Sequence, residues 1–292
     1  MRLRCAPVWM KLCAMAFELV DQLSLPGDPA HANEDAFGAQ AHAAVVLDGA
    51  TPLGDPLMPG NSDAQWLANF GARRLLAHLT DGAGARKALR GALGDAQKSF
   101  GALRRGPLED VWQTPAASMM LAVAGDGEVE LLWFGDCAAL LQQSDGAVSV
   151  IGPGFDGKAG EAALAARAAR DGNQPATARQ FHIDVLRARR NRLNSGEYWL
   201  FTPDVRAAVH AGRRIVKAQA GAHLLLASDG FLALASDYGA YNADTLMAAV
   251  RTKGLAVLAA ELRAIEDADP LGEKFPRFKK SDDATALLLK IQ

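Results

Sequence analysis

The stretch that decides the fold is Ala43-Ala44-Val45-Val46-Leu47-Asp48-Gly49, in which five apolar residues are followed at once by an acid and a glycine. A continuous apolar run of this length predicts a strand that is buried on both faces. Asp48 is therefore expected at the end of a buried strand. Two more acids lie beside apolar runs in the same way, since Asp229 follows the segment 224–228 and Asp282 precedes the segment 284–291.

The sequence around this stretch groups its strands and helices, and does not alternate them. Gly-Asp and Asp-Gly pairs between short apolar runs are typical of an antiparallel meander. Grouped strands favour an α+β fold with a two-sheet core and helix layers outside, over a doubly wound sheet. The periodicity predicts strands at 15–20, 36–39, 43–47, 116–124, 128–134, 137–143, 147–151, 198–202, 214–218, 223–227 and 284–291, and helices at 64–79, 85–103, 243–250 and 255–265.

The chain contains no internal repeat and no clear linker, so we predict one domain over residues 1–292. Residues 152–195 are rich in Ala, Gly and Arg and poor in large apolar side chains. We interpret this segment as a helix and mobile loops, a flap at the rim of a site. The basic run 186–192 within it is interpreted as a solvated face.

Composition excludes several classes of protein. With 31 basic and 33 acidic residues and a net charge of −2, the chain shows no sign of nucleic-acid binding. Its three cysteines, Cys5, Cys13 and Cys137, have no metal-finger spacing and suit a reducing, cytoplasmic location. Residues 1–14 only faintly imitate a signal peptide, because Lys11 interrupts the apolar run. No apolar run is long enough to predict a membrane span.

Each of the acids has an ordinary explanation, since Asp-Gly is a common turn dipeptide. In combination they suggest more. Carboxylates that meet at the ends of buried strands repel one another unless cations pair with them. An all-oxygen ligand set selects Mn²⁺ or Mg²⁺, and a glycine after the acid, as at Gly49 and Gly230, lets the backbone approach an ion. This chemistry is typical of hydrolysis by a hydroxide shared between two ions.

Six short segments carry a family resemblance: Asn33-Glu34-Asp35, Val46-Leu47-Asp48-Gly49, Ser118-Met119-Met120, Gly135-Asp136-Cys137-Ala138, Leu226-Ala227-Ser228-Asp229-Gly230 and Ser281-Asp282-Asp283-Ala284-Thr285. In this order they resemble the metal-dependent protein phosphatases of the PP2C type, from about residue 16 to the end. The resemblance implies a four-layer α-β-β-α sandwich with two ions in a cleft between the sheets. It also implies a phosphorylated protein as partner and hydrolysis of phosphoserine or phosphothreonine.

By position, the resemblance makes Asp48 the carboxylate that bridges both ions, with the Gly49 carbonyl beside it. Asp229 and Asp282 would bind one ion, and Glu34 would reach the other directly or through water. Asp48, Asp229 and Asp282 would thus be the catalytic set. The other acids of the six segments are expected around this set or at a third ion: Asp35, Asp136 and Asp283.

The chain departs from the family pattern where the family contacts the substrate. Ala30 replaces a common arginine that grips phosphate, and Ala50 replaces a histidine proposed to protonate the leaving group. Ala138, or its neighbour Ala139, replaces a further arginine. Each lost charged contact should weaken substrate binding by about 1.5–3 kcal/mol. The residues considered as replacements are His31, Arg73 and Arg74.

Three other functions fit parts of the sequence. The loss of these polar groups would suit a catalytically weak binding or sensing module, although the retained acids argue against it. The glycine pattern 152–157 imitates a dinucleotide-binding loop, but the strand before it ends a hairpin and does not open a βαβ unit. Ser228 imitates the nucleophile of an acyl hydrolase, but Leu226 stands where that motif needs glycine.

Overall fold

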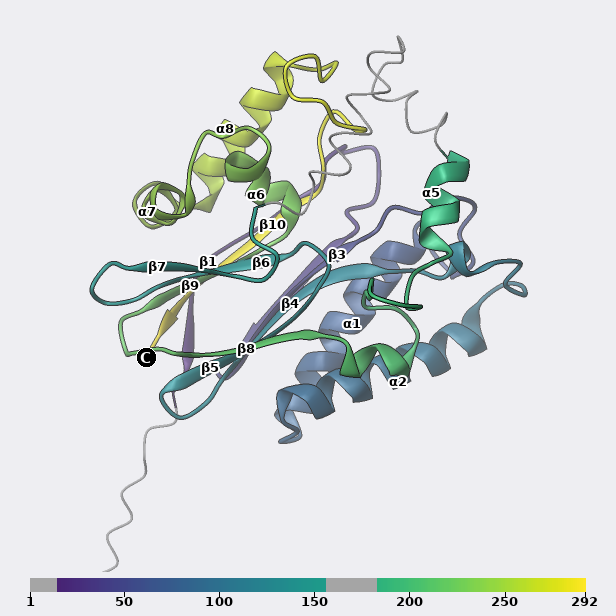
Figure 1. The fold of residues 1–292 in the computed structure, drawn as a ribbon, viewed down its shortest axis with the longest axis horizontal. Helices are drawn as coiled ribbons and strands as arrows, with labels where there is room; N and C mark the ends of the chain where they lie inside the picture. The colour runs from purple at the N-terminus through teal and green to yellow at the C-terminus, as the bar shows by residue number, and fades with distance from the viewer. Residues whose placement is uncertain (1–14, 156–182) are drawn as a thin grey trace, which may run out of the picture.

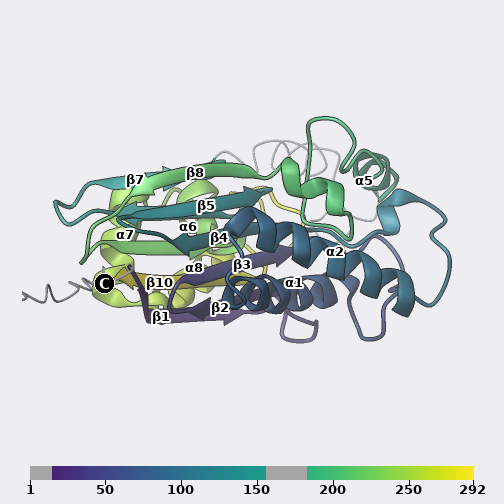
Figure 2. The same ribbon diagram turned by 90° about the horizontal axis from the view of Figure 1, so that it is seen from below.

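The computed structural model describes residues 15–155 and 183–292. Two five-stranded antiparallel sheets lie face to face, and helices cover the outer face of each sheet (Figures 1 and 2). The predicted α+β four-layer sandwich is therefore confirmed. Residues 1–14, with Cys5 and Cys13, and residues 156–182 of the predicted flap lie outside the described part.

The first sheet, called sheet A, has the strand order β1-β10-β9-β6-β7. Its strands are β1 (Phe17–Leu25), β6 (Ala138–Gln142), β7 (Val148–Ile151), β9 (His223–Ala227) and β10 (Ala284–Ile291). The second, sheet B, has the order β2-β3-β4-β5-β8. Its strands are β2 (Asp35–Gln40), β3 (Ala43–Gly49), β4 (Ala117–Ala124), β5 (Glu128–Phe134) and β8 (Gly212–Lys217).

Two helices cover sheet B, α1 (Asp63–Thr80) and α2 (Ala85–Leu103). Three cover sheet A: α6 (Asp229–Ser236), α7 (Ala243–Lys253) and α8 (Leu255–Ala268). One more helix, α5 (Ile183–Arg190), and the short 3-10 helices η1 (Val111–Gln113) and η2 (Val205–Val209) lie outside these layers. None of the helices in the described ranges is long and apolar enough to cross a bilayer.

The apolar strand β3 lies in the middle of this sandwich. Along β3, Val45 and Leu47 pack against α1 and α2, whereas Ala44 and Val46 pack into the layer between the two sheets. Successive side chains of a strand point to opposite faces, so both faces of β3 are buried and its sequence shows no alternation. The strand is thus a rigid support for the acid at its end.

The predicted elements differ from the structure in three places. The predicted strand 198–202 forms only a single bridge, between Phe201 and Ala117, before the chain turns into η2. Helix α6 was not predicted, because its start, Asp229-Gly230, was interpreted as a turn. Strand β1 continues to Leu25, where its side chains alternate between partly buried and exposed positions.

Candidate metal centre and active site

Three aspartates from distant parts of the chain meet at one end of the sandwich. Asp48 lies near the end of β3, Asp136 in the turn between β5 and β6, and Asp229 at the first residue of α6. One carboxylate oxygen from each lies within 4.8 Å of the others, and we call these three residues the acid cluster. The cluster joins sheet B to sheet A, and its all-oxygen donors are those that Mn²⁺ and Mg²⁺ prefer.

The turn before Asp136 determines how its carboxylate is oriented. Gly135 has φ of 63°, and a Cβ there would lie 2.2 Å from the Ser118 hydroxyl oxygen. The glycine therefore leaves room for Ser118, whose Oγ donates a 2.6 Å hydrogen bond to Asp136 Oδ1. The sequence had placed Asp136 around the ion ligands or at a third ion, but the structure brings it directly beside Asp48 and Asp229.

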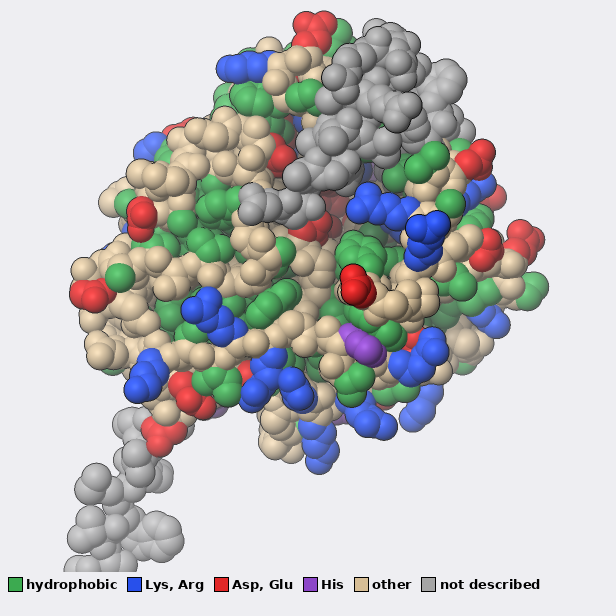
Figure 3. Space-filling model, in the orientation of Figure 1, with side chains coloured by type: hydrophobic (Ala, Val, Ile, Leu, Met, Phe, Trp, Pro, Cys, Tyr) green, Lys and Arg blue, Asp and Glu red, His purple; other side chains and the backbone are tan. Residues whose placement is uncertain are grey.

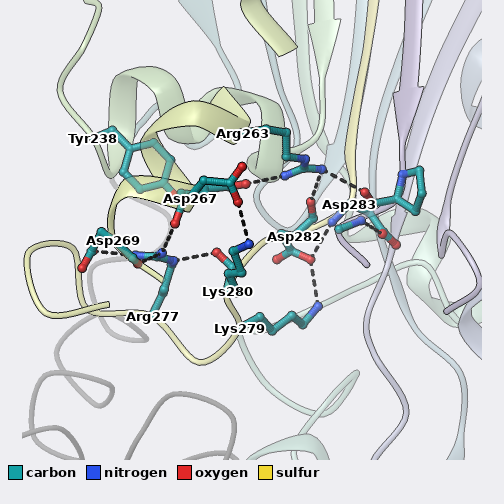
Figure 4. Close-up of polar contacts among 12 residues, drawn as sticks. Tyr238, Arg263, Asp267, Asp269, Arg277, Lys279, Lys280, Asp282 and Asp283 are labelled. Carbon is teal, nitrogen blue, oxygen red and sulfur yellow. Dashed lines mark hydrogen bonds and ion pairs between the residues drawn. The ribbon is translucent and has the colours of Figure 1, made fainter. Parts of the chain in front are cut away.

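Asp282 lines the same cavity as the acid cluster, a hollow of about 220 Å³. Its Oδ1 lies 2.8 Å from the Lys279 ammonium (Figure 4). Lys279 also donates a 2.9 Å hydrogen bond to the Thr51 hydroxyl. Among the described residues, Asp282 is not part of a group of three close metal-ligating atoms. The structure thus places Asp282 at the wall of the cavity, paired with a lysine that the sequence analysis had not singled out.

Glu34 and Gly49 lie against each other beside this cavity. The Gly49 N–H donates to the Glu34 carbonyl at 3.2 Å, and a Cβ at position 49 would lie 2.5 Å from that oxygen. The Glu34 carboxylate accepts a short hydrogen bond from Ser62, the N-cap of α1. Burial raises the pKa of Glu34, and the Ser62 hydrogen bond acts in the opposite direction. A glycine is therefore needed at 49 for the backbone to reach Glu34.

Asp283 has a structural role. Its Oδ1 accepts the Gly27 N–H at 2.7 Å and its Oδ2 accepts the Glu34 N–H at 2.6 Å, so it ties the loop between β1 and β2 to the start of β10. Its backbone carbonyl lies 1.9 Å from where a Cβ on Gly230 would be. The glycine after Asp229 thus allows β10 to pass close to α6, and the resemblance alone did not reveal this contact.

Asp35 is the most unusual acid of the site. It lies opposite Asp48 in the β2–β3 register, is only 5% exposed, and has no hydrogen-bond partner for either carboxylate oxygen within the described residues. Burial raises the pKa of Asp35 to about 8, and Asp283 and Asp282 add to the rise. Burial also raises the pKa of Asp48, together with the charges of Asp35 and Asp229. Divalent cations would relieve this repulsion, so the residues present fit the ions expected from the sequence.

Basic side chains lie on the cavity wall next to these acids, and Figure 3 shows Lys and Arg side chains beside a hollow with acidic side chains in it. They are Arg189 and Arg190 of α5, together with Lys279. Within the run 186–192, interpreted as a solvated face, Arg189 is exposed, whereas Arg190 is half-buried, and both line the cavity. The run itself was visible in the sequence, but nothing in it showed which arginines face the acids.

The cations considered as replacements for the missing arginine lie elsewhere. His31 is exposed and pairs with Asp28 at 2.9 Å, and Arg74 pairs with Asp95 at 2.6 Å between α1 and α2. Neither of them lines the cavity, nor does Arg73, whereas Ala50 does. The site has therefore lost the polar groups at positions 30 and 50 without compensation from these neighbours.

The hypotheses of a dinucleotide-binding loop and of an acyl-hydrolase nucleophile find no support in the structure. Strand β7 pairs antiparallel with β6, so the glycine-rich loop that follows it leaves a hairpin; its last two residues, 156 and 157, lie outside the described part. Ser228 is fully buried, and its Oγ accepts the Thr285 N–H at 2.9 Å. A serine used in this way is no exposed nucleophile.

No family model matches this sequence, and no curated protein is similar to it. The similarity lies in the fold. The serine/threonine phosphatase PstP of Mycobacterium tuberculosis is 18% identical, with a TM-score of 0.56 over 95% of this chain and 98% of its own. A second structure of the PstP catalytic domain, 17% identical with a TM-score of 0.56, covers 95% of this chain and 99% of its own and contains two manganese ions. PppA of Pseudomonas aeruginosa, a regulatory component of type VI secretion, is 17% identical, with a TM-score of 0.52 over 95% of this chain and all of its own. This chain therefore has the fold of the PP2C-type phosphatases.

Proposed function

We propose that this chain is a phosphomonoester hydrolase that requires divalent metal ions and dephosphorylates phosphoserine and phosphothreonine in proteins. The observation that carries the proposal is the acid cluster of Asp48, Asp136 and Asp229, with the unpartnered Asp35 beside it. A close group of half-buried carboxylates is costly without cations, and this one lines a cavity. Solved structures of the same fold are phosphatases, and one of them holds two manganese ions.

The proposal assigns the ions, two of Mn²⁺ or Mg²⁺, to a set of five residues: Glu34, Asp48, Asp229, Asp282 and the backbone of Gly49. When bound, these ions would supply an activated water and neutralise negative charge on the phosphoryl group. Asp136 joins the set through its closeness to Asp48 and Asp229. Asp283, which was expected around the set or at a third ion, is assigned no ion, because both its oxygens accept backbone N–H groups. We also propose a cytoplasmic location, on the sequence argument alone.

The chain itself contributes rigidity to this chemistry. Asp48 is held between β2 and β4 by regular strand pairing, with Asp35 and Ser118 as its neighbours in register. Ser118 in turn fixes the carboxylate of Asp136. Ligands on paired strands hold their geometry better than ligands on loops, and fixed charges stabilise a developing charge without reorganising. The acid cluster is therefore suited to hold ions in one arrangement.

The experiment that tests the proposal is a phosphatase assay with matched variants. The purified protein is supplied with Mn²⁺ or Mg²⁺ and assayed on p-nitrophenyl phosphate and on a phosphothreonine peptide. Asp48→Asn should abolish hydrolysis of both, whereas Asp126→Asn, which removes the same charge from the exposed β4–β5 turn, should have no effect. Hydrolysis that survives Asp48→Asn or EDTA would refute the metal mechanism.

A second candidate function is a binding or sensing module with little turnover. The observations that favour it are Ala30 and Ala50 at the positions of substrate-contacting groups, and the pairing of Asp282 with Lys279. The same assay separates the two functions. A protein that binds Mn²⁺ stoichiometrically in calorimetry but hydrolyses neither substrate is a binding module.

A further inference from the structure

We propose that Arg190 and Lys279 together bind the phosphoryl group of the substrate, in place of the arginine that is missing at position 30. This inference rests on the proposed function and names the residues that recognise the substrate. Both side chains line the cavity of the acid cluster. They come from different elements, Arg190 from α5 and Lys279 from the loop between α8 and β10.

The two cations meet at one residue. Lys279 Nζ donates to the Thr51 side-chain oxygen at 2.9 Å, and Arg190 Nη1 donates to the Thr51 backbone carbonyl at 3.0 Å. Thr51 follows Asp48-Gly49-Ala50 directly and lines the cavity. The positive charges are therefore fixed next to the acid cluster, at the place where the substrate would approach it.

The loop that carries Lys279 is held rigidly, as Figure 4 shows. Asp269 accepts the backbone N–H groups of the segment 273–275 at 2.8, 3.2 and 3.0 Å and pairs with Arg277 at 2.9 Å. On the other side of Lys279, Arg263 donates a 2.8 Å hydrogen bond to the Asp282 carbonyl. Little conformational freedom is left for Lys279 to lose when it binds an anion.

Helix α5 is fastened to the wall of the cavity in a similar way. Arg187 donates two hydrogen bonds to the Leu53 carbonyl, at 2.7 and 3.1 Å, and stacks on Trp112 with its guanidinium carbon 4.2 Å from the ring centre. Just after the helix, Asn191 accepts the Trp112 N–H at 2.7 Å. These contacts of Arg187 and Asn191 hold α5 in place and thereby position Arg190 at its end. A helix of this length needs such contacts to be stable.

A phosphorylated substrate needs two such cations in this cavity, because the cavity wall is already acidic. A phosphate monoester brings up to two negative charges into a cavity whose wall already carries Asp48, Asp136, Asp229 and Asp282. The phosphoryl oxygens that do not touch an ion need donors, and arginine and lysine are the usual ones. Each such contact changes affinity roughly tenfold to a hundredfold. The two cations thus supply the charged hydrogen-bond donors for phosphate that Ala30 does not provide.

The test measures phosphate binding and turnover separately. The Mn²⁺-loaded full chain is titrated with orthophosphate by calorimetry, and KM and kcat are measured on the phosphothreonine peptide. Arg190→Gln and Lys279→Gln should each weaken orthophosphate binding and raise KM by roughly tenfold to a hundredfold. Arg192→Gln, an exposed position off the cavity that loses the same charge, should change neither. Lys279→Arg keeps the charge and should retain phosphate binding.

The outcomes separate this inference from the proposed function. Orthophosphate binding as tight in Arg190→Gln and Lys279→Gln as in Arg192→Gln would overturn the inference, and so would wild-type protein that binds no orthophosphate. Hydrolysis with unchanged KM in both variants leaves the phosphatase standing without this pair. Orthophosphate binding that depends on the pair, in a protein that hydrolyses nothing, supports the inference and refutes the phosphatase. Melting curves in Mn²⁺ check folding, and Lys279→Gln carries the test alone if Arg190→Gln does not fold.

Discussion

The buried Asp35 predicts an unusual dependence of stability on pH in the metal-free protein. Its carboxyl group has a pKa of 3.8 in its ordinary state and about 8 in the folded chain. Below the ordinary pKa the group is protonated in both the folded and the unfolded chain. Between the two values it is protonated only in the folded chain, so the free energy of unfolding decreases as the pH rises. Above about pH 8 Asp35 is ionised in both states, and its contribution to the free energy of unfolding is fully lost.

The size of the effect follows from the shift. Each pH unit in this interval changes the free energy of unfolding by about 1.4 kcal/mol for one such group. From about pH 5 to about pH 8 the contribution of Asp35 should thus fall by on the order of 4 kcal/mol. For a large domain this corresponds to roughly 10 °C in melting temperature.

The assay compares wild type with Asp35→Asn, both in EDTA, by thermal melting across this pH range. The asparagine variant keeps the shape of the side chain and cannot titrate, so the difference between the two curves reports the titration of Asp35 together with its effect on Asp48. We expect wild type to lose roughly 10 °C relative to the variant between about pH 5 and about pH 8. With Mn²⁺ present the difference should shrink, because a nearby divalent ion lowers the pKa of a carboxyl group. Parallel curves in EDTA would refute the reasoning.

Three further changes test single contacts. Gly230→Ala places a Cβ 1.9 Å from the Asp283 carbonyl, so it should lower the free energy of unfolding in urea by at least about 2 kcal/mol. Asp269→Asn weakens the acceptor of three backbone N–H groups, and should cost about 1–3 kcal/mol in the same assay; an unchanged urea midpoint would contradict its role. Ser118→Ala removes the hydrogen bond to Asp136, and should weaken Mn²⁺ binding in calorimetry roughly tenfold to a hundredfold while leaving the fold intact.

The layers of the fold could be predicted from the sequence because burial is visible in the local pattern of apolar residues. The run at β3 is apolar at every position, since α1 packs on one face and sheet A on the other. The hairpins from β4 to β7 are marked by glycine and aspartate turns that need no distant partner. Helix α6 is hard to recognise in the sequence, because its apolar residues follow those of β9 after only three residues, 228–230.

The candidate site was only partly predictable. Asp48 and Asp229 are marked by the strands before them, and the structure brings them together. The closeness of Asp136 depends on the Ser118 hydroxyl, which a sequence pattern does not reveal. Lys279 and Arg190 were missed for a different reason. Lys279 lies in an irregular loop and Arg190 at the end of α5, and both are placed by contacts with segments remote in sequence, which leave no periodicity.

The pairing of β1 with β10 has a consequence for how this chain folds during synthesis. Sheet B is complete once residue 217 has emerged, whereas sheet A places the strand 284–291 between β1 and β9. The backbone groups of β1 therefore stay unpaired until almost the whole chain has been synthesised. An unpaired strand can associate with strands of other chains. A translational pause or a loss of residues after 283 would leave half of the sandwich finished and the other half open. Asp48 would then lie on a complete sheet, whereas Asp229, at the start of α6, would lie in the half of the sandwich that lacks β10.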